Sequence, residues 1–386
     1  MSKQGKYLSN LQLKNELERC LNCKEAPCAD GCPLHLSPRE FIAFAKQGNM
    51  QAAVNVIRSK NPLGLVCGLV CPSQFCMKNC LRGRIDCAIK IPQVQAVLAQ
   101  NVSNIPANDF AANGRKIAVV GGGPAGMAAA WALQNQGCEV ELFESSDKIG
   151  GALNLIPEVR LPREAIERDW QEVIDIGHIK VHYHSRVDDA SRLLDSGFDG
   201  VIIAIGVAEV PMNIKGEDNM ITYSDYLHSP QKYKNAQNVG IIGGGKVAAD
   251  CALCASLNGA NEVILFVRRR MQDMRMPTED LAEILAYGVK IMPLTRVTEV
   301  QKGDNSLICT TCSTTVQDGQ CQDVKNSEVE REGFDLLIKA TGGGKKNLQD
   351  SNKIIAAGDC KNGSTTVVEA VVSGIEAAKK LLVALG

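Results

Sequence analysis

Hydrophobic residues in the second and third quarters of the chain recur as short runs separated by helix-like stretches. An apolar run at 117–120 leads into a glycine cluster, then into an alanine-rich stretch, and then into a second apolar run at 140–143. The same order returns between residues 239 and 267. Short apolar runs on either side of a helical pattern favour a parallel β-α-β unit. The pattern therefore predicts two such units in one chain.

The flanking residues predict how the chain is organised. Helical patterns fill the first hundred residues, and one of them opens with Ser37 as a cap, Pro38 as the first helical residue and Glu40 to complete a capping box. A polar stretch at 101–115 is typical of a linker. Residues 341–386 are too few for a core of their own, and their apolar strand and terminal helix are expected to complete the first unit.

The expected fold class is α/β. It has a helical N-terminal domain followed by two Rossmann-like nucleotide-binding domains, the second inserted in the first. The predicted boundaries are 1–105 for the helical domain, 115–207 and 342–386 for the first nucleotide-binding domain, and 208–341 for the inserted one.

Composition adds the cysteines. The chain has 386 residues and 16 cysteines, nine of them between Cys20 and Cys87. The polar N-terminus has no secretory core, and no stretch approaches a membrane span, so a reducing cytoplasm is expected, where clustered thiols bind metal or do redox chemistry. With 42 basic and 43 acidic side chains, no basic tract suggests nucleic acid or a membrane as a partner.

The two glycine clusters differ in the residues that end the next strand. Gly121, Gly123 and Gly126 match G-x-G-x-x-G, and Glu144 ends the next strand where an acid would bind a ribose hydroxyl. The second cluster, 243–248, is the G-x-G-x-x-A variant, and its next strand ends in three arginines at 268–270. Because arginine suits a 2′-phosphate, we expect NADPH rather than NADH at the second site, with a solvated basic turn as the alternative.

The cysteine spacing indicates the metal. One run is Cys20-x2-Cys23-x4-Cys28-x3-Cys32-Pro, and a second contains Cys67, Cys71, Cys76 and Cys80. Structural zinc prefers paired C-x2-C knuckles, whereas runs ending in Cys-Pro are typical of ferredoxin clusters. The spacing favours iron–sulfur over zinc or unliganded thiols. Outside this field, Cys251 and Cys254 are interpreted as packed side chains rather than a redox disulfide, and the set of Cys309, Cys312 and Cys321 lacks a visible fourth zinc ligand.

At this point the chain resembles the glutamate synthase small-subunit-like flavoproteins, and within them the N-terminal half of dihydropyrimidine dehydrogenase. The resemblance rests on the strings CLNCKEAPCADGCP, NPLGLVCGLVCP, VVGGGPAGMAAAWAL, IPEVRLP, VRRRMQDMRMP and AAGDCKNGSTTVVEAV. It implies two 4Fe–4S clusters in the helical domain, an FAD domain and an inserted NADPH domain. One cluster would be held by Cys20, Cys23, Cys28 and Cys80, and the other by Cys32, Cys71, Cys76 and Gln95, with Cys67 left as a spare thiol.

The glycine turns and the resemblance together give the cofactor contacts. For FAD they are Gly121, Gly123, Pro124, Ala125, Gly126, Glu144, Gly151, Ala152, Arg160, Gly358, Asp359, Thr366, Val367 and Val368. For NADPH they are Gly243, Gly244, Gly245, Lys246, Val247, Arg268, Arg269, Arg275, Ala340, Thr341 and Gly342. Lys246 departs from the family, which usually has Asp there. No side chain is expected to act as an acid or base, because the cofactors carry the chemistry.

The functional expectation is an NADPH-oxidising electron-input subunit. It would pass electrons through FAD and two 4Fe–4S clusters to a larger catalytic subunit similar to dihydropyrimidine dehydrogenase. The alternatives are a glutamate synthase small subunit and a ferredoxin–NADP oxidoreductase or transhydrogenase subunit. A different class of function, an iron–sulfur redox sensor, would use the same clusters without turnover.

Overall fold

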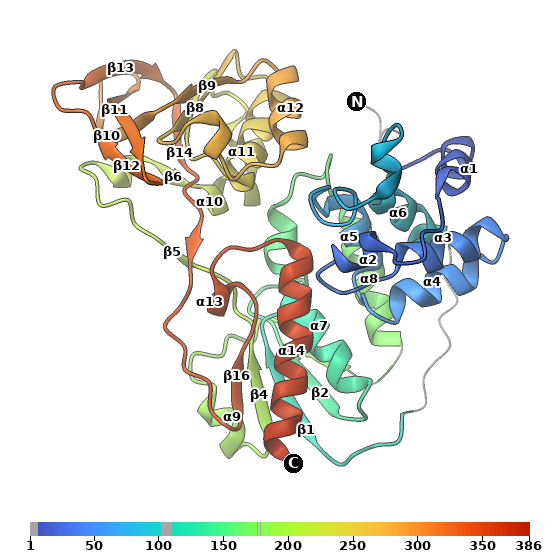
Figure 1. Ribbon diagram of the computed structural model, residues 1–386. Coiled ribbons are helices and arrows are strands. Elements are labelled where there is room, and N and C mark those ends of the chain that lie inside the picture. Colours follow the sequence, from blue (N-terminus) through green and yellow to red (C-terminus); the bar gives the residue numbers. More distant parts are fainter. Residues whose placement is uncertain (1–6, 102–109, 176, 178) are drawn as a thin grey trace. The chain divides into compact units, whose positions relative to one another are not determined.

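The computed structural model describes residues 7–101, 110–175, 177 and 179–386 (Figure 1). Most of the predicted linker, at 102–109, lies outside the described residues. The chain separates into two compact units: Met1–Asn154, Glu158–Ala208 and Gly344–Gly386 form one, and Leu155–Pro157 with Glu209–Gly343 form the other. The first unit contains both the helical part and the first sheet, so the boundary expected between them stays a prediction.

Short helices build the N-terminal part of the first unit. They are α1 (Asn10–Arg19), α2 (Pro27–Asp30), α3 (Pro38–Lys46), α4 (Met50–Arg58), α5 (Gly64–Val70) and α6 (Ile91–Asn101). Ser37 caps α3 by accepting the Glu40 N–H, as expected, and Pro38 is its first residue. The helical pattern then breaks at Gly48, whose φ of +81° favours glycine, and Asn49 caps a new helix. One predicted pattern thus forms two helices.

The helical part has its own apolar core. Phe41, Ile57 and Val94 are fully buried in it, and they come from α3, α4 and α6. Five of the clustered cysteines pack against or within this core: Cys20, Cys28, Cys32, Cys76 and Cys80. The cysteines, from the short helix α2 and from the loops, therefore lie against the packed helix faces.

The first sheet is parallel, with the order β16-β4-β1-β2-β3. Its strands are β1 (Lys116–Val120), β2 (Glu139–Phe143), β3 (Ile179–His182), β4 (Gly200–Ile203) and β16 (Ile354–Ala356), and its helices are α7 (Pro124–Gln134), α8 (Arg163–Asp175), α9 (Ser191–Asp195), α13 (Asp359–Asn362) and α14 (Val367–Leu385). Because β16 pairs with β4 from far along the chain, the C-terminal residues complete this sheet, which confirms the predicted insertion.

The second unit contains the other parallel sheet, with the order β6-β14-β7-β8-β9. Its elements are β6 (Ile221–Thr222), β7 (Asn238–Ile242), β8 (Glu262–Val267), β9 (Lys290–Pro293), β14 (Leu336–Lys339), α10 (Tyr223–His228), α11 (Lys246–Leu257) and α12 (Thr278–Ala286). An antiparallel sheet follows, built from β10 (Thr295–Lys302), β11 (Leu307–Gln317), β12 (Gln320–Asp323) and β13 (Val329–Phe334). Short strands β5 (Ala208–Glu209) and β15 (Gly343–Gly344) pair where the chain enters and leaves this unit.

Candidate functional site

The first glycine turn joins β1 to α7, and each glycine has a distinct physical reason. Gly121 has a φ of +102°, and a Cβ there would lie 2.4 Å from the Ala204 carbonyl oxygen. A Cβ on Gly126 would lie 1.9 Å from the Gly121 oxygen, so the helix can pack against the turn only if residue 126 has no side chain. Gly123 faces open space, with nothing within 4 Å of an added Cβ. This is the cradle that a pyrophosphate requires: a tight turn, close packing and one open glycine at the N-terminus of a helix.

Glu144 lies just after β2 and is buried. Its Oε2 accepts the Gly122 N–H at 2.7 Å, and its Oε1 accepts the Ser146 N–H at 2.8 Å and the Ser146 hydroxyl at 2.9 Å. Since a carboxylate offers about four acceptor positions, Oε2 keeps capacity for a further donor such as a ribose hydroxyl. Glu144 therefore shapes the glycine turn itself, beyond the ribose contact expected for it.

The segment after residue 149 folds back onto the glycine turn. The Gly150 N–H donates to the Gly122 oxygen at 2.9 Å, and a Cβ on Gly151 would come within 3.1 Å of the Gly123 Cα. Ala152, the next expected FAD contact, is exposed within a 3₁₀ turn, whereas Arg160 is buried at 6% exposure. The Gly151 backbone thus lies beside the open glycine of the cradle.

The helix α14 begins close to the same cradle. Thr366 and Glu369 form a capping box: Thr366 Oγ1 accepts the Glu369 N–H, and the Glu369 carboxylate accepts the Thr366 N–H at 2.9 Å. The N–H groups of Val367 and Val368 belong to the first turn, where backbone donors have no partner inside the helix. A Cβ on Gly358 would lie 2.6 Å from the Ala125 Cβ, which places this loop against α7. Burial raises the pKa of the neighbouring Asp359 carboxyl, which accepts the Thr365 hydroxyl.

The second glycine turn, between β7 and α11, repeats the geometry of the first. Gly243 has a φ of +154°, and an added Cβ would lie 2.2 Å from the Ala340 oxygen. Gly245 faces open space. A Cβ on Gly244 would lie 2.8 Å from a Val267 methyl group. Lys246 is the first residue of α11, next to Val247 in its first turn. The turn is therefore also shaped to receive a pyrophosphate.

The arginines after β8 are not equivalent. Arg270 forms an ion pair with Asp273 at 2.5 Å. Among the described residues, Arg268, Arg269 and Arg275 form no ion pair, and Arg268 and Arg275 are exposed. An arginine without a carboxylate partner is available to a phosphate. The positions that sequence reasoning assigned to the 2′-phosphate are thus the available ones. Ala340 is buried at the end of β14, and Thr341 and Gly342 lead from it into β15.

Four of the clustered thiols line one hollow in the helical part, the first cysteine pocket. It is lined by Cys20, Cys23, Cys28 and Cys80 among others. Burial raises the pKa of the Cys28 thiol to about 11, and the nearby Cys80 and Cys20 add to the rise. These four are the set that the family resemblance assigned to one cluster. A cluster assembled on these thiols would need them as thiolates and would release their protons.

A second hollow, the second cysteine pocket, contains the other set of clustered thiols. Its lining includes Cys32, Cys71, Cys76 and Gln95, the set assigned to the other cluster. Cys67 lines it as well, and burial raises the pKa of its thiol to about 12. The Gln95 side-chain amide donates to the Gly64 oxygen at 2.7 Å, which fixes the orientation of the amide group.

The two pockets share a wall, and the second pocket also borders the first turn of α14. Pro38 and Ile91 line both pockets, so one layer of apolar side chains separates them. Val368, in the first turn of α14, also lines the second pocket. The order in space is therefore the α14 N-terminus, the second pocket, the shared wall and the first pocket. Sequence reasoning had no signal for Pro38 and Ile91, because a shared wall is a tertiary property.

The loops that supply the thiols of the two pockets are backbone-strained. Asn22, Ala26 and His35 have φ values of 50°, 42° and 50° although none is glycine. Such conformations cost about 1–3 kcal/mol each and are typical of ligand clamps. Among the described residues, no three His, Cys, Asp or Glu side chains converge to hold a single ion. The thiols are instead spread around hollows, an arrangement that fits a multi-iron cluster.

The remaining cysteines have other surroundings. All 16 are free thiols. Cys251 and Cys254 are buried on α11, and Cys309 and Cys312 are buried on β11. Burial raises the pKa of Cys251 well above its ordinary value, which keeps the thiol neutral. Cys251 and Cys309 are thus packed as small apolar side chains, whereas the Cys312 thiol also interacts with Arg296.

Comparison with known proteins places these features in a family. The family described as pyridine nucleotide-disulphide oxidoreductase matches residues 115–374, about two thirds of the chain. The chain belongs to this family. Residues 2–105 match a second family, described as dihydropyrimidine dehydrogenase domain II, 4Fe–4S cluster. Together the matches confirm an NAD(P)H-dependent FAD and iron–sulfur oxidoreductase, and they confirm the resemblance seen in the sequence.

Individual relatives are also named as subunits of oxidoreductases. The NAD-dependent dihydropyrimidine dehydrogenase subunit PreT of Escherichia coli strain K12 is 28% identical over 393 residues, covering 97% of this chain and 94% of the relative. The NADPH-Fe(3+) oxidoreductase subunit beta of Geobacter sulfurreducens is 29% identical over 292 residues, covering 69% of this chain and 42% of that protein. The solved structure of Mycobacterium tuberculosis FprA with NADPH has a TM-score of 0.61 at 16% identity, covering 70% of this chain and 84% of that one, and supports the fold.

Among the described residues, no helix is both long enough and apolar enough to cross a bilayer.

Proposed function

We propose that this chain is an NADPH-oxidising electron-input subunit that transfers electrons through FAD and two 4Fe–4S clusters to a larger catalytic subunit. The observation that carries the proposal is the line of sites in the first unit. Val368 of the flavin-side helix lines the second cysteine pocket, and Pro38 and Ile91 join that pocket to the first. When bound, the flavin and the clusters convert a two-electron hydride transfer into single-electron steps.

The chain's own residues position these groups. The Gly121–Gly126 cradle and the first turn of α14 present backbone N–H groups, and the helix dipole there favours negative charge. The apolar wall of Pro38 and Ile91 is buried and keeps water out of the space between the pockets. We assign Cys20, Cys23, Cys28 and Cys80 to the outer cluster, and Cys32, Cys71, Cys76 and Gln95 to the inner one.

For the nucleotide we propose NADPH. The support is that Arg268 and Arg269 lack carboxylate partners among the described residues, whereas Arg270 is paired with Asp273. A permanent positive charge with bidentate donors recognises the 2′-phosphate that NADH lacks. A relative that matches over nearly its full length is named NAD-dependent, and another is named for NADPH. The names of the relatives therefore do not distinguish the two nucleotides, and the proposal of NADPH rests on the arginines.

For the partner we propose a catalytic subunit similar to dihydropyrimidine dehydrogenase. The support is that the relative matching over nearly the whole chain is named as a subunit of that enzyme. The relatives named for iron(III) or formate match over less than half of their own length. The free thiols fit a reducing compartment, and we propose the cytoplasm.

The test is a cofactor count on protein purified without oxygen. Two 4Fe–4S clusters predict about eight irons, about eight sulfides and one FAD per chain. Fewer than about four irons per chain in folded, flavin-loaded protein would overturn the two-cluster proposal. Zinc in place of iron would overturn it as well.

A further inference from the structure

The rim of the first cysteine pocket is exposed and partly apolar. Leu21 lines the pocket and is 43% exposed, and Ile85, in the loop that follows the ligand Cys80, is 66% exposed. Ile85 is joined to the pocket wall through its N–H, which donates to the oxygen of the pocket-lining Arg82 at 2.9 Å. Large aliphatic side chains are usually buried, so the exposure of Leu21 and Ile85 is informative. They belong to the rim of the first pocket, which is farther from the N-terminus of α14 than the second pocket is.

The same rim carries an excess of positive charge. The two segments that supply the four thiols, 20–30 and 78–90, contain five basic and three acidic side chains, although the whole chain has a net charge of −1. Asp86 is already neutralised, since Arg82 contacts it at 2.8 Å and Arg19 at 3.0 Å. Among the described residues, the remaining cations of these segments form no ion pair: Lys24, Lys78, Arg84 and Lys90. All four are exposed.

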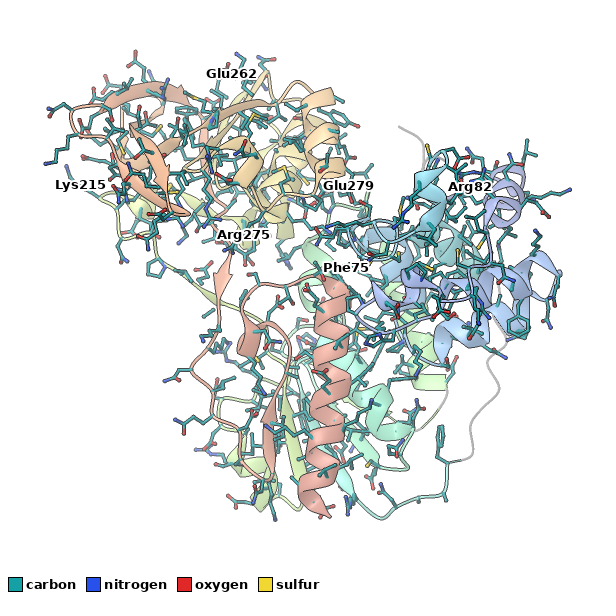
Figure 2. The ribbon with its side chains drawn as sticks, in the orientation of Figure 1. Phe75, Arg82, Lys215, Glu262, Arg275 and Glu279 are labelled. Carbon is teal, nitrogen blue, oxygen red and sulfur yellow. The ribbon has the colours of Figure 1, made fainter. Side chains whose placement is uncertain are left out.

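Arginine side chains hold this rim in shape. Arg39, which lines the pocket, donates to the Lys24 oxygen at 2.8 Å and to the Cys23 oxygen at 3.3 Å. Arg82, labelled in Figure 2, lines it from the other side and makes a bidentate contact with Asp86. The loops that bear the exposed cations and aliphatic side chains are thus tied to the wall of the pocket.

We propose that this rim, formed by Leu21, Lys24, Lys78, Arg84 and Ile85, is the docking surface for an electron-accepting protein with acidic residues around its redox centre. The proposal rests on the proposed function and adds the chemistry of the partner's surface. Transient protein–protein interfaces commonly have an apolar centre and a polar or charged rim. Opposite charges on the two proteins increase their association rate. One electron leaves the outer cluster, which is oxidised, and the acceptor gains it. No bond forms or breaks.

The first test compares two acceptor proteins of opposite charge, with NADPH as donor. The acidic acceptor is a Rieske-type ferredoxin, because its potential is higher than that of plant-type ferredoxins and lets NADPH reduce it. Its kcat/KM is expected to fall at least tenfold from low to high salt, and that of the basic cytochrome c is not, because steering between opposite charges changes association rates by about 10 to 1,000-fold. Added salt is expected to slow the ferredoxin reaction. A ferredoxin rate that does not fall with added salt would overturn the proposal.

The second test uses matched variants of exposed residues. Arg84→Glu and Ile85→Glu are expected to lower ferredoxin reduction about tenfold. Their controls, Arg186→Glu and Val383→Glu, are expected to leave it unchanged, since Val383 is 82% and the Arg186 side chain 80% exposed elsewhere in the same unit. NADPH oxidation by the small neutral quinone menadione is expected to stay normal in all four.

The outcomes separate the two proposals. Equal ferredoxin rates in rim and control variants, with wild-type protein active, would overturn the docking surface alone. Failure of wild-type protein to reduce either acceptor protein, with menadione reduction intact, would overturn electron delivery and the docking surface together.

Discussion

The carboxylate of Asp169 on α8 accepts the backbone N–H of Val66 at 2.8 Å, at the start of α5. Its other oxygen accepts the Leu65 N–H at 3.2 Å, and Asp169 is 2% exposed. Nearby, Arg58 on α4 contacts Glu172 on α8 at 2.6 Å. The helix α5, which carries Cys67 and has Cys71 as its C-cap, is therefore held by a buried acid from a helix of the first sheet's unit.

Asp169 gives the first prediction, a dependence of stability on pH. Burial raises the pKa of its carboxyl to about 8, against about 3.9 for an unfolded Asp. Between these values the folded protein holds a proton that the unfolded chain has lost, so the stability contributed by this group falls as pH rises from about 4 to about 8. Asp169→Asn lacks this titration but loses one acceptor, at a cost of about 1–3 kcal/mol.

The measurement is the thermal midpoint of anaerobic holoprotein at pH 5, 7 and 9. The deficit of Asp169→Asn relative to wild type is expected to shrink as the pH rises. Asp175→Asn, which alters an exposed carboxylate of the same helix, controls for general weakening of α8. A constant deficit across the range would contradict the assignment.

The second prediction separates the roles of two glycines in the flavin cradle. Gly126→Ala forces a contact with the Gly121 oxygen and is expected to destabilise the flavin-free protein by about 1–3 kcal/mol. Gly123→Ala adds a methyl group where the structure is open. It is expected to change the free energy of unfolding of the flavin-free protein by no more than about 0.5 kcal/mol and to weaken FAD binding. Equal FAD affinity in Gly123→Ala and wild type would show that the pyrophosphate does not approach there.

The third prediction concerns ligands of the inner cluster. Cys76→Ser is expected to lower iron by about half, since a 4Fe–4S site loses a thiolate. Cys67→Ser is expected to retain full iron, although Cys67 lines the same pocket. The measurement is iron and sulfide per chain with FAD content as reference. Loss of iron in Cys67→Ser with retention in Gln95→Ala would instead make Cys67 the fourth ligand.

The fourth prediction tests the nucleotide preference. Arg268→Ala and Arg269→Ala are expected to raise the KM for NADPH about tenfold or more and to leave the KM for NADH nearly unchanged, since each removes a charge-assisted contact of about 1.5–3 kcal/mol. Arg270→Ala is the matched control, because Arg270 is bound to Asp273. Steady-state kinetics with menadione measure all three. Equal effects on both nucleotides would mean that the arginines do not bind the 2′-phosphate.

Local patterns carried the correct parts of the sequence prediction. The glycine turns are fixed by contacts within one β-α-β unit, so Gly121 and Gly243 could be interpreted from spacing alone. The insertion followed from the repeated pattern and from the short C-terminal remainder. The ligand sets came from the family resemblance, because sequence spacing does not specify which thiols of two crossed runs share a pocket.

Features that depend on tertiary contact could not be predicted. Asp169 is one carboxyl among many on an amphipathic helix, and its role arises from α5 packing against α8. The wall of Pro38 and Ile91 forms only when two loops surround it. The antiparallel strands β10 to β13 have polar, partly exposed sequences whose pattern is weak.

Electron flow from the nucleotide through the clusters is tested most directly by a variant of the outer cluster, Cys23→Ser. The measurement is NADPH-driven reduction of ferredoxin beside NADPH-driven reduction of menadione, on anaerobic protein with full FAD content. Electron transfer through the outer cluster predicts that ferredoxin reduction is lost while menadione reduction is retained. Retention of both activities in protein that lacks the outer cluster would contradict it.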